Sequence, residues 1–276
     1  MMKKKLRIPS RSYYREHLKK YSQYTFSDDW IDWGLRIITY RAKRMAKILE
    51  EHVEKDARVL DLGCGIGLSL HILAQIFPNT VGCDIDEKAL KACDKILKEV
   101  GVSNIDLKLY DGRKLPFSSN TFDGILSIEV VEHVENPNLM LKEIQRVLKK
   151  DGILIITTPN KYWPMETHYK LPFLSFLPRK ISDYYVRVSG KGKKYDIYPP
   201  SYNNFSRLVS EYFSFKDITT DVIMRYKEFN LDKERGKKVK YVAKFLRVVR
   251  KLKLNSLEKI VAFVFPGWIF VAKVKH

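Results

Sequence analysis

Two carboxylates and a histidine stand close together in the segment SIEVVEHVENP, at Glu129, Glu132 and His133. On one helical turn, residues three and four positions apart share a face, so these side chains can converge. Such a trio could bind a divalent cation, or it could present His133 as a general base with Glu132 beside it. A third interpretation gives the histidine only a structural role. The residues alone leave all three open.

A glycine-rich turn lies earlier in the chain, in the segment VLDLGCGIG. Glycines 63, 65 and 67 follow an apolar run, with Cys64 between the first two. Without a Cβ atom, the backbone can turn tightly, approach a ligand and present N–H groups at the start of a helix. No Gly-Lys-Ser/Thr follows, which excludes a phosphate-binding P-loop. The dinucleotide fingerprint is also imperfect, because Leu68 stands where a third glycine or alanine is expected.

Three aspartates mark the ends of three predicted strands. Asp61 lies just before the glycine turn, where a carboxylate can orient the loop or meet a cationic ligand. Asp84 ends the second strand and is placed to accept hydrogen bonds from ribose hydroxyls. Asp111 ends the third strand in YDGRKLPF, where its carboxylate and backbone could contact an adenine amino group. Each alone could be a helix cap or a turn residue, but three at successive strand ends indicate a nucleoside site.

The elements that position these residues alternate along the middle of the chain. Short apolar runs predict strands at 58–63, 80–85, 105–111, 122–129 and 153–160. Helical segments between them are predicted at 68–77, 86–101 and 136–152. Strands this apolar, alternating with helices, indicate a doubly wound parallel sheet covered on both faces. Such a sheet binds its ligand at the carboxyl ends of the strands, where the aspartates stand.

The remaining segments flank this core. We expect three parts: a basic helical extension at 1–55, a ligand-binding core at 56–160, and a third part at 161–276. The third part combines a proline- and aromatic-rich loop or lid with further strands of the same sheet and a basic helix. Within 1–55, apolar spacing predicts a helix over 29–55. Within 161–276, the predicted elements are a loop at 161–200, a helix at 203–213, strands at 215–224 and 268–275, and a basic helix at 237–254.

The core resembles the class I S-adenosylmethionine-dependent methyltransferases, in particular those of the ubiquinone-pathway O-methyltransferase type. The resemblance rests on VLDLGCGIG, VGCDID, DGRKLPF, FDGILSIEVVEHV and EIQRVLKKDGILIITTPN, which occur in that order between about 55 and 160. It implies a Rossmann-like seven-stranded sheet with a reversed last strand, and S-adenosylmethionine as methyl donor. It places the glycine turn at the methionine part of the cofactor, Asp84 at the ribose, and Asp111 with Gly112 at the adenine. The predicted cofactor-binding residues are Asp61, Gly63, Cys64, Gly65, Gly67, Asp84, Ile85, Asp111, Gly112 and Glu129.

The Glu-x-x-Glu-His segment is similar to one in the ubiquinone-pathway O-methyltransferases and in the small-RNA 3′-end 2′-O-methyltransferases. In those relatives it is linked to a magnesium-type ion, so Glu129, Glu132 and His133 are candidate ligands, with His168 as a fourth. Related enzymes with no known metal also carry Glu-His-Val at this place. Our prediction therefore gives His133 and Glu132 catalytic roles, with a divalent cation as an open alternative.

The acceptor is less well specified by the residues. Strand four does not end in the Asn/Asp-Pro-Pro-aromatic segment that looks typical of nucleic-acid amino methyltransferases, which favours an oxygen acceptor. The lid adds aromatic residues and Leu-Pro pairs, which suit a lipid-like, quinone-like or glycan small molecule. The alternatives are an RNA 2′-O-methyltransferase and a non-catalytic cofactor-binding protein.

The net charge of +19 lies in the flanks. Residues 56–160 contain 12 Lys and Arg against 15 Asp and Glu, whereas residues 161–276 contain 25 against 10. In the 237–254 helix, Val239, Leu246 and others form an apolar stripe beside lysines, which predicts either packing on the sheet or peripheral contact with an anionic membrane. Nucleic acid is the less favoured partner. Three cysteines without a CxxC pattern, and a start without a secretory signal, predict a cytoplasmic protein.

Overall fold

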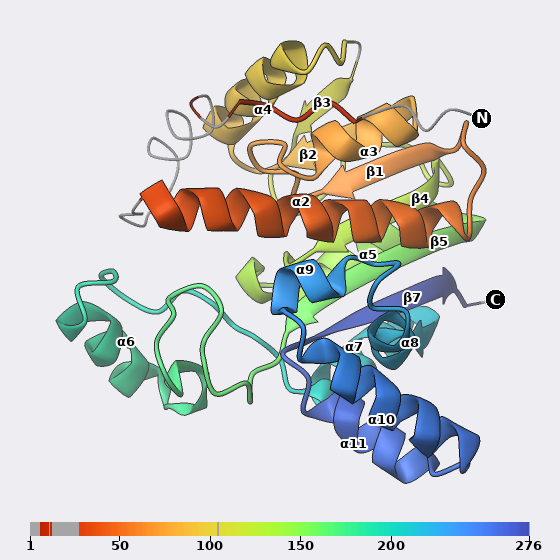
Figure 1. The fold of residues 1–276 in the computed structure, drawn as a ribbon. Coiled ribbons are helices and arrows are strands. Elements are labelled where there is room, and N and C mark those ends of the chain that lie inside the picture. Colours follow the sequence, from red (N-terminus) through yellow and green to blue (C-terminus); the bar gives the residue numbers. More distant parts are fainter. Residues whose placement is uncertain (1–5, 11, 13–27, 104, 276) are drawn as a thin grey trace.

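A seven-stranded sheet with the order β3-β2-β1-β4-β5-β7-β6 lies at the centre of the computed structural model (Figure 1). The structure describes residues 6–10, 12, 28–103 and 105–275, so most of the predicted extension before residue 28 lies outside the described residues. The strands are β1 (Arg58–Leu62), β2 (Asn79–Asp84), β3 (Asp106–Leu109), β4 (Phe122–Ile128), β5 (Leu148–Pro159), β6 (Phe213–Asp217) and β7 (Gly267–Val274).

The first five strands are parallel, and β7 is inserted antiparallel between β5 and β6. This confirms the predicted doubly wound, Rossmann-like sheet with a reversed last strand. On one face lie α2 (Asp28–Glu50), α3 (Leu70–Ile76) and α8 (Thr219–Met224), and on the other α5 (Pro137–Val147) and α7 (Tyr202–Tyr212). The helix α4 (Glu87–Glu99) covers β2 and β3.

Alternation along β1 shows why the sheet is covered on both faces. Val59 belongs to the apolar cluster of α2 and α3, whereas its neighbour Leu60 belongs to that of α5 and α7. Both side chains are completely buried. Successive strand residues point to opposite faces, so an uninterrupted apolar run requires a cover on each side. From β1 the strand order runs to β2 and β3 on one side and to β4 and β5 on the other. The carboxyl end of β1 is therefore the topological switch point of the sheet, where ligands of such folds bind.

Helix ends in the core follow the sequence signals. Asp86 caps α4 by accepting hydrogen bonds from the backbone N–H groups of Lys88 and Ala89. Gly101, just past the end of α4, has the positive φ of 63° that was expected at a helix terminus. These caps fix where β2 ends and α4 starts, and therefore where Asp84 stands.

Three predicted elements are wrong in part. Residues 219–224 form helix α8 rather than a continuation of the strand, because Asp217 accepts the N–H of Thr219 and ends β6 there. The predicted helix 136–152 ends at Val147, since Leu148 already pairs with Phe122 in the sheet. Residues 161–200 are not all loop, but contain the 3-10 helix Leu174–Phe176 and helix α6 (Arg179–Val188).

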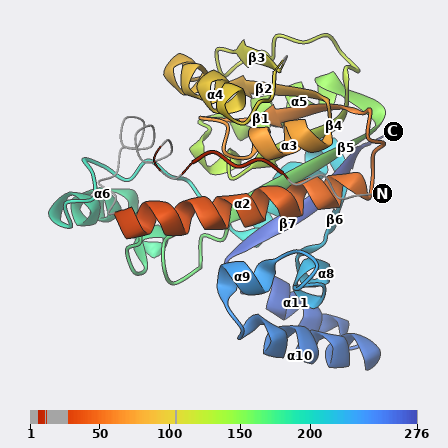
Figure 2. The same cartoon turned by 45° about the horizontal axis from the view of Figure 1, so that its top comes forward.

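Beyond β6 the chain adds a helical layer at the edge of the sheet. It consists of α8, α9 (Leu231–Arg235), α10 (Val239–Lys251) and α11 (Asn255–Phe263). In both views, α10 and α11 lie on the outside of the molecule, while α6 projects beside the carboxyl edge of the sheet (Figures 1 and 2). None of the helices in the described residues is long and apolar enough to cross a membrane.

Candidate active site at the carboxyl edge of the sheet

The glycine turn forms the first wall of the site. Its glycines 63, 65 and 67 all have positive φ, the left-handed region that glycine adopts without strain. A Cβ on Gly63 would lie 2.5 Å from Cγ2 of Val130, because this backbone passes directly beside the end of β4. A Cβ on Gly65 would meet nothing within 4 Å. The turn is therefore packed on one side and open on the side where a ligand could approach.

Asp84 joins the turn to the next strand end. Its Oδ2 accepts the backbone N–H of Gly65 at 2.7 Å, and its Oδ1 accepts that of Asp86 at 2.9 Å. Two backbone donors therefore hold the carboxylate rigid between the glycine turn and the start of α4. Each oxygen keeps a second lone pair for a ligand hydroxyl. The arrangement suits a ribose diol, as the sequence predicts.

The third strand end presents an apolar surface beside a polar one. Asp111 accepts the N–H groups of Arg113 and Lys114 on one oxygen, and these backbone hydrogen bonds lower the pKa of its carboxyl. A Cβ on Gly112, whose φ is +76°, would lie 3.9 Å from Cγ2 of Ile85. Ile85 itself is 62% exposed at the end of β2. An exposed aliphatic side chain beside an open backbone and an acid fits the face and edge of a purine.

Asp61 differs from the other two aspartates because it is buried. Only 2% of it is exposed, and its Oδ2 has no hydrogen-bond partner among the described residues. Burial, and then repulsion by Asp84, raise its pKa to about 7. A nearby positive charge would stabilise the ionised form of this carboxyl. S-adenosylmethionine carries two such charges, a sulfonium and an ammonium group.

Replacing Asp61 by Asn is expected to stabilise the ligand-free protein at pH 8. Between pH 4 and 7 the folded state binds more protons at this carboxyl than the unfolded state does, so its contribution to stability falls as pH rises. An amide of the same shape does not ionise, so the variant should gain about 1–4 kcal/mol at pH 8 and nothing at pH 4. Urea unfolding at both pH values measures the difference. Equal stability of the two proteins at pH 8 would contradict the assignment.

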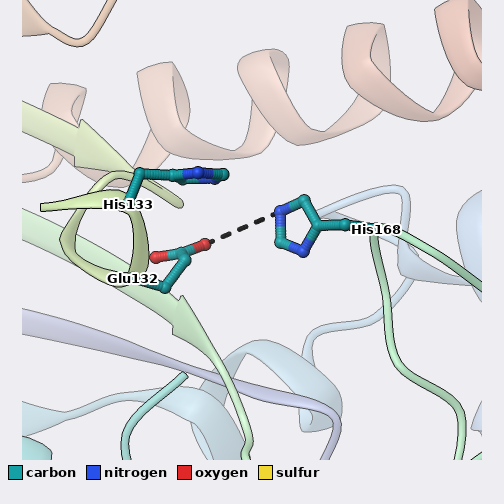
Figure 3. Close-up of side chains that lie close together, drawn as sticks. All are labelled: Glu132, His133 and His168. Atoms are coloured by element: carbon teal, nitrogen blue, oxygen red, sulfur yellow. Dashed lines mark ion pairs between the residues drawn. The ribbon is translucent and has the colours of Figure 1, made fainter. Parts of the chain in front are cut away.

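At the end of β4, the 3-10 helix η1 (Val131–His133) carries the second part of the site. Glu132 and His133 project from it towards His168, which comes from the lid (Figure 3). Oε1 of Glu132 lies 3.9 Å from Nε2 of His168, and the two imidazole rings meet edge to face at 5.1 Å. One ligand atom from each of the three residues lies within 4.8 Å of the others.

The protonation of this group follows from its surroundings. Glu132 is completely buried, and this burial, with repulsion by Glu129, raises its pKa to about 8. His133 is exposed to solvent at one side, but partial burial and the neighbouring His168 lower its pKa. At neutral pH His133 is therefore neutral and can accept a proton, whereas ligand-free Glu132 is mostly protonated. The base of the pair is the histidine.

His168 is held by a residue that the sequence analysis missed. Glu166 is only 3% exposed, and one oxygen lies 3.1 Å from Nδ1 of His168 while the other accepts the N–H of the same residue. Burial lowers the pKa of His168, but the hydrogen bond to Glu166 and the negative charges of the nearby glutamates together outweigh it and raise that pKa. With Nδ1 engaged, Nε2 is directed to Glu132. The only signal in the sequence was a carboxylate two positions before a histidine.

Glu129 lies apart from this trio. With φ of 54°, it turns to Arg41 of α2, whose Nη1 contacts both carboxylate oxygens at 2.8 and 2.9 Å. Burial works against ionisation, but Arg41 holds the pKa of Glu129 below its usual range. Arg41 and Arg44 also bind Glu234 of α9, whose pKa falls to about 2. The structure thus groups His168 with Glu132 and His133, and pairs Glu129 with an arginine that sequence reasoning did not single out.

The trio fits a divalent cation by its chemistry. The buried Oε1 of Glu132 has no hydrogen-bond partner among the described residues and faces two imidazoles. One carboxylate with two histidines is a donor set that first-row transition metals accept readily. Because Glu129 is ion-paired to Arg41, it could join the set only after leaving that partner.

A groove leads to this region from the surface. It has a volume of about 560 Å³ and runs between the lid and helices α10 and α11. Trp163 and Met165 line it from the lid, Val242 from α10 and Val264 from just past α11. Arg41, the partner of Glu129, also lines it. Thr167 also lines it, and its hydroxyl lies 3.2 Å from Nδ1 of His168, so the groove ends next to the trio without including any of its members.

Fold and site together describe an α/β protein with a glycine turn and three aspartates at the carboxyl edge of its sheet, and a buried glutamate with two histidines at the next strand end. Comparison with known proteins makes this specific, because residues 60–156 match the family model described as "Methyltransferase domain". These residues form a class I S-adenosylmethionine-dependent methyltransferase domain. The methyltransferase family inferred from the sequence is thereby confirmed for this part of the chain.

Named relatives match the domain but not the rest. A ubiquinone biosynthesis O-methyltransferase of Parvibaculum lavamentivorans is 35% identical over 107 residues, covering 39% of this chain and 42% of that protein. A norajmaline N-methyltransferase of Rauvolfia serpentina is 29% identical over 117 residues, covering 42% and 40%. The chain thus spans less than half the length of these relatives. Since one methylates oxygen and the other nitrogen by name, the domain does not fix the acceptor atom.

The fold extends over more of the chain than the sequence similarity does. The crystal structure of the PH0226 protein from Pyrococcus horikoshii OT3 matches with a TM-score of 0.52 at 18% identity, covering 94% of this chain and 99% of that one. At this identity the likeness shows a shared fold only. It supports the inclusion of β6 and β7 in the same sheet as the domain.

Proposed function

We propose that the chain is an S-adenosylmethionine-dependent O-methyltransferase whose acceptor is a lipid-like, quinone-like or glycan small molecule. The observation that carries this is the groove, whose partly apolar lining extends to Arg41, the partner of Glu129, and to Thr167, which contacts His168. The printed name of the Parvibaculum relative supports an oxygen acceptor of the quinone type.

The cofactor roles follow the strand ends. Gly63, Gly65 and Gly67, with Cys64 in the same turn, would lie along the methionine part of the cofactor, with Asp61 beneath them. Asp84 would accept hydrogen bonds from the ribose. Ile85 and Gly112 would pack on the adenine ring, and Asp111 would lie at its edge. Glu129 would lie between cofactor and acceptor, held by Arg41.

The reaction requires few protein groups. The acceptor oxygen attacks the methyl carbon in line, the carbon–sulfur bond breaks, and its electron pair stays on sulfur, which becomes a neutral thioether. The acceptor proton passes to the neutral imidazole of His133, whose lowered pKa keeps it unprotonated beforehand. Holding the two reactants in line accounts for much of the acceleration.

A divalent cation is a second way in which the same residues could act. Glu132, His133 and His168 would hold it, with Glu166 keeping His168 in place. A bound cation would lower the pKa of an acceptor hydroxyl and so make its oxygen more nucleophilic. Removal of metal by a chelator distinguishes this role from that of His133 as the base.

Labelled S-adenosylmethionine offered to lipid, glycan and RNA fractions in parallel tests the proposal. We expect label in an apolar or glycan product, and mass-spectrometric fragmentation of that product should place the methyl group on an oxygen atom. Salt-sensitive binding to RNA, with the label in RNA, would replace the proposal by an RNA 2′-O-methyltransferase. Cofactor binding without turnover in any fraction would indicate a non-catalytic protein. Chelator is included in half of each set, and activity insensitive to it would remove the cation from the account.

A further inference from the structure

Helix α10 carries two apolar faces, of which only one packs on the protein. Val239, Ala243, Leu246 and Val249 are buried against α8 and α9. A second stripe recurs at 241, 245, 248 and 252, a spacing that places these residues on one face of a helix. Its members are exposed: Tyr241, Phe245, Val248 and Leu252. The sequence analysis expected one apolar stripe and missed the second.

Helix α11 and the turn before it continue this exposed surface. Its exposed large apolar residues have exposed fractions of 41–56%: Leu254, Leu257, Ile260, Phe263 and Val264. Of these, Ile260 and Phe263 lie towards α7 and line a separate hollow with Tyr202. We call the exposed residues of α10, α11 and the intervening turn the hairpin face. Single exposed apolar side chains are ordinary, but so many on two adjacent helices indicate a surface that is covered in use. In Figure 1 both helices lie at the lower end of the molecule, away from the central sheet.

The charge of the same segment is strongly positive. Residues 237–265 contain nine Lys and Arg and a single acid, Glu258, which is ion-paired to Arg250. Four lysines on α10 or just before it follow the exposed apolar stripe along one side: Lys237, Lys240, Lys244 and Lys251. All four are exposed. An apolar stripe bordered by lysines is the arrangement of helices that lie in the interface of an anionic membrane.

The hairpin face is continuous with the groove. Val242 of α10 and Val264 next to α11 are exposed and also line the groove, opposite Met165 of the lid. The mouth of the groove therefore opens where the two helices meet the lid. A molecule whose apolar part lies at the hairpin face could place its polar head in the groove near Arg41 without first leaving the membrane for bulk water.

We propose that the hairpin face docks this protein on an anionic lipid bilayer, so that a membrane-resident acceptor enters the groove directly. A second copy of this chain fits the hairpin face less well than an anionic bilayer does. A two-fold interface would place the nine cations of one hairpin against the same nine of the other. The acceptor part of this inference rests on the proposed function, whereas the docking itself requires neither cofactor nor turnover.

Co-sedimentation with vesicles tests the docking in the absence of S-adenosylmethionine. The full-length protein is mixed with vesicles of phosphatidylcholine alone, or with about one third phosphatidylglycerol, at low and high salt. We expect binding to the anionic vesicles, weakened by salt. The double variant Tyr241→Asp, Phe245→Asp should bind at least about tenfold more weakly. Both side chains are exposed, so circular dichroism and thermal unfolding should match the wild type.

Charge is tested separately with matched variants. Reversal of three hairpin lysines (Lys240→Glu, Lys244→Glu, Lys251→Glu) should also lower binding at least about tenfold. The same reversal of Lys88, Lys91 and Lys95, exposed on the distant α4, should lower it much less although the net charge is equal.

Three results would overturn the proposal: no binding by the wild type, equal losses in the hairpin and α4 variants, or a stable dimer that Phe245→Asp dissociates. Methylation of a detergent-dispersed acceptor is measured in parallel. Vesicle binding with no methylation would refute the proposed function and leave the docking standing, and the reverse result would refute the docking alone.

Discussion

Replacing Asp84 by Ala should weaken binding of S-adenosylmethionine by about 10²-fold or more. A carboxylate that bridges two ribose hydroxyls contributes two charge-assisted hydrogen bonds, each worth about 1.5–3 kcal/mol. Its loss also frees the Gly65 N–H that now donates to Oδ2, so the glycine turn loses its fixed position. Isothermal titration of the purified protein with the cofactor measures the change directly.

Asp106→Ala is the matched control for this prediction. Asp106 belongs to the nearby strand β3, where its half-exposed side chain pairs with Lys108. This variant should bind the cofactor as the wild type does. If Asp84→Ala and the wild type bound with the same affinity, the nucleoside site would not lie at this edge of the sheet.

Replacing His133 by Ala should lower the turnover number by about 10²–10⁴-fold while cofactor affinity stays unchanged. The imidazole is neutral at neutral pH and lies within the trio but outside the glycine turn, so its removal affects proton transfer rather than cofactor binding. Because His133 is exposed, the variant should also keep its unfolding temperature. Single-turnover measurements with saturating cofactor separate the chemical step from binding.

His52→Ala serves as the control histidine, since it lies just past the end of α2, far from the carboxyl edge. It should retain full turnover. A His133→Ala enzyme with normal turnover would refute a catalytic role for this side chain. A variant that loses cofactor affinity in proportion to turnover would instead make His133 a binding residue.

The core of the fold and one half of the site were predictable from local signals. Most strands of the core are short apolar runs with an acid or a glycine at or just past their end, and helices α4 and α5 begin at the side-chain caps Asp86 and Asn136. These are nearest-neighbour effects, so Asp84 and the glycine turn could be assigned without coordinates. Helix α8 was not predictable in this way. Its residues favour a strand by type, and only the hydrogen bond from Thr219 to Asp217 ends β6 before them.

The second half of the site depends on contacts between distant segments. Glu129, Glu132 and His133 share a helical spacing, but the chain turns at Glu129 and directs it to Arg41, 88 residues earlier. His168 reaches Glu132 from the lid, and Glu166 orients it through a hydrogen bond that a sequence does not encode by spacing. The second apolar face of α10 could not be recognised from the sequence either, although its residues are local. Periodicity shows where apolar residues lie but not which of two stripes is packed.

The most direct test of the account measures both products of one reaction. The purified chain is incubated with methyl-labelled S-adenosylmethionine and a total lipid extract, and S-adenosylhomocysteine and labelled lipid are quantified together. We predict equal molar amounts of the two, with the label on an acceptor oxygen, and the loss of both in the Asp84→Ala and His133→Ala variants. Formation of neither product, with cofactor binding intact, would contradict the assignment of this chain as a methyltransferase of an apolar acceptor.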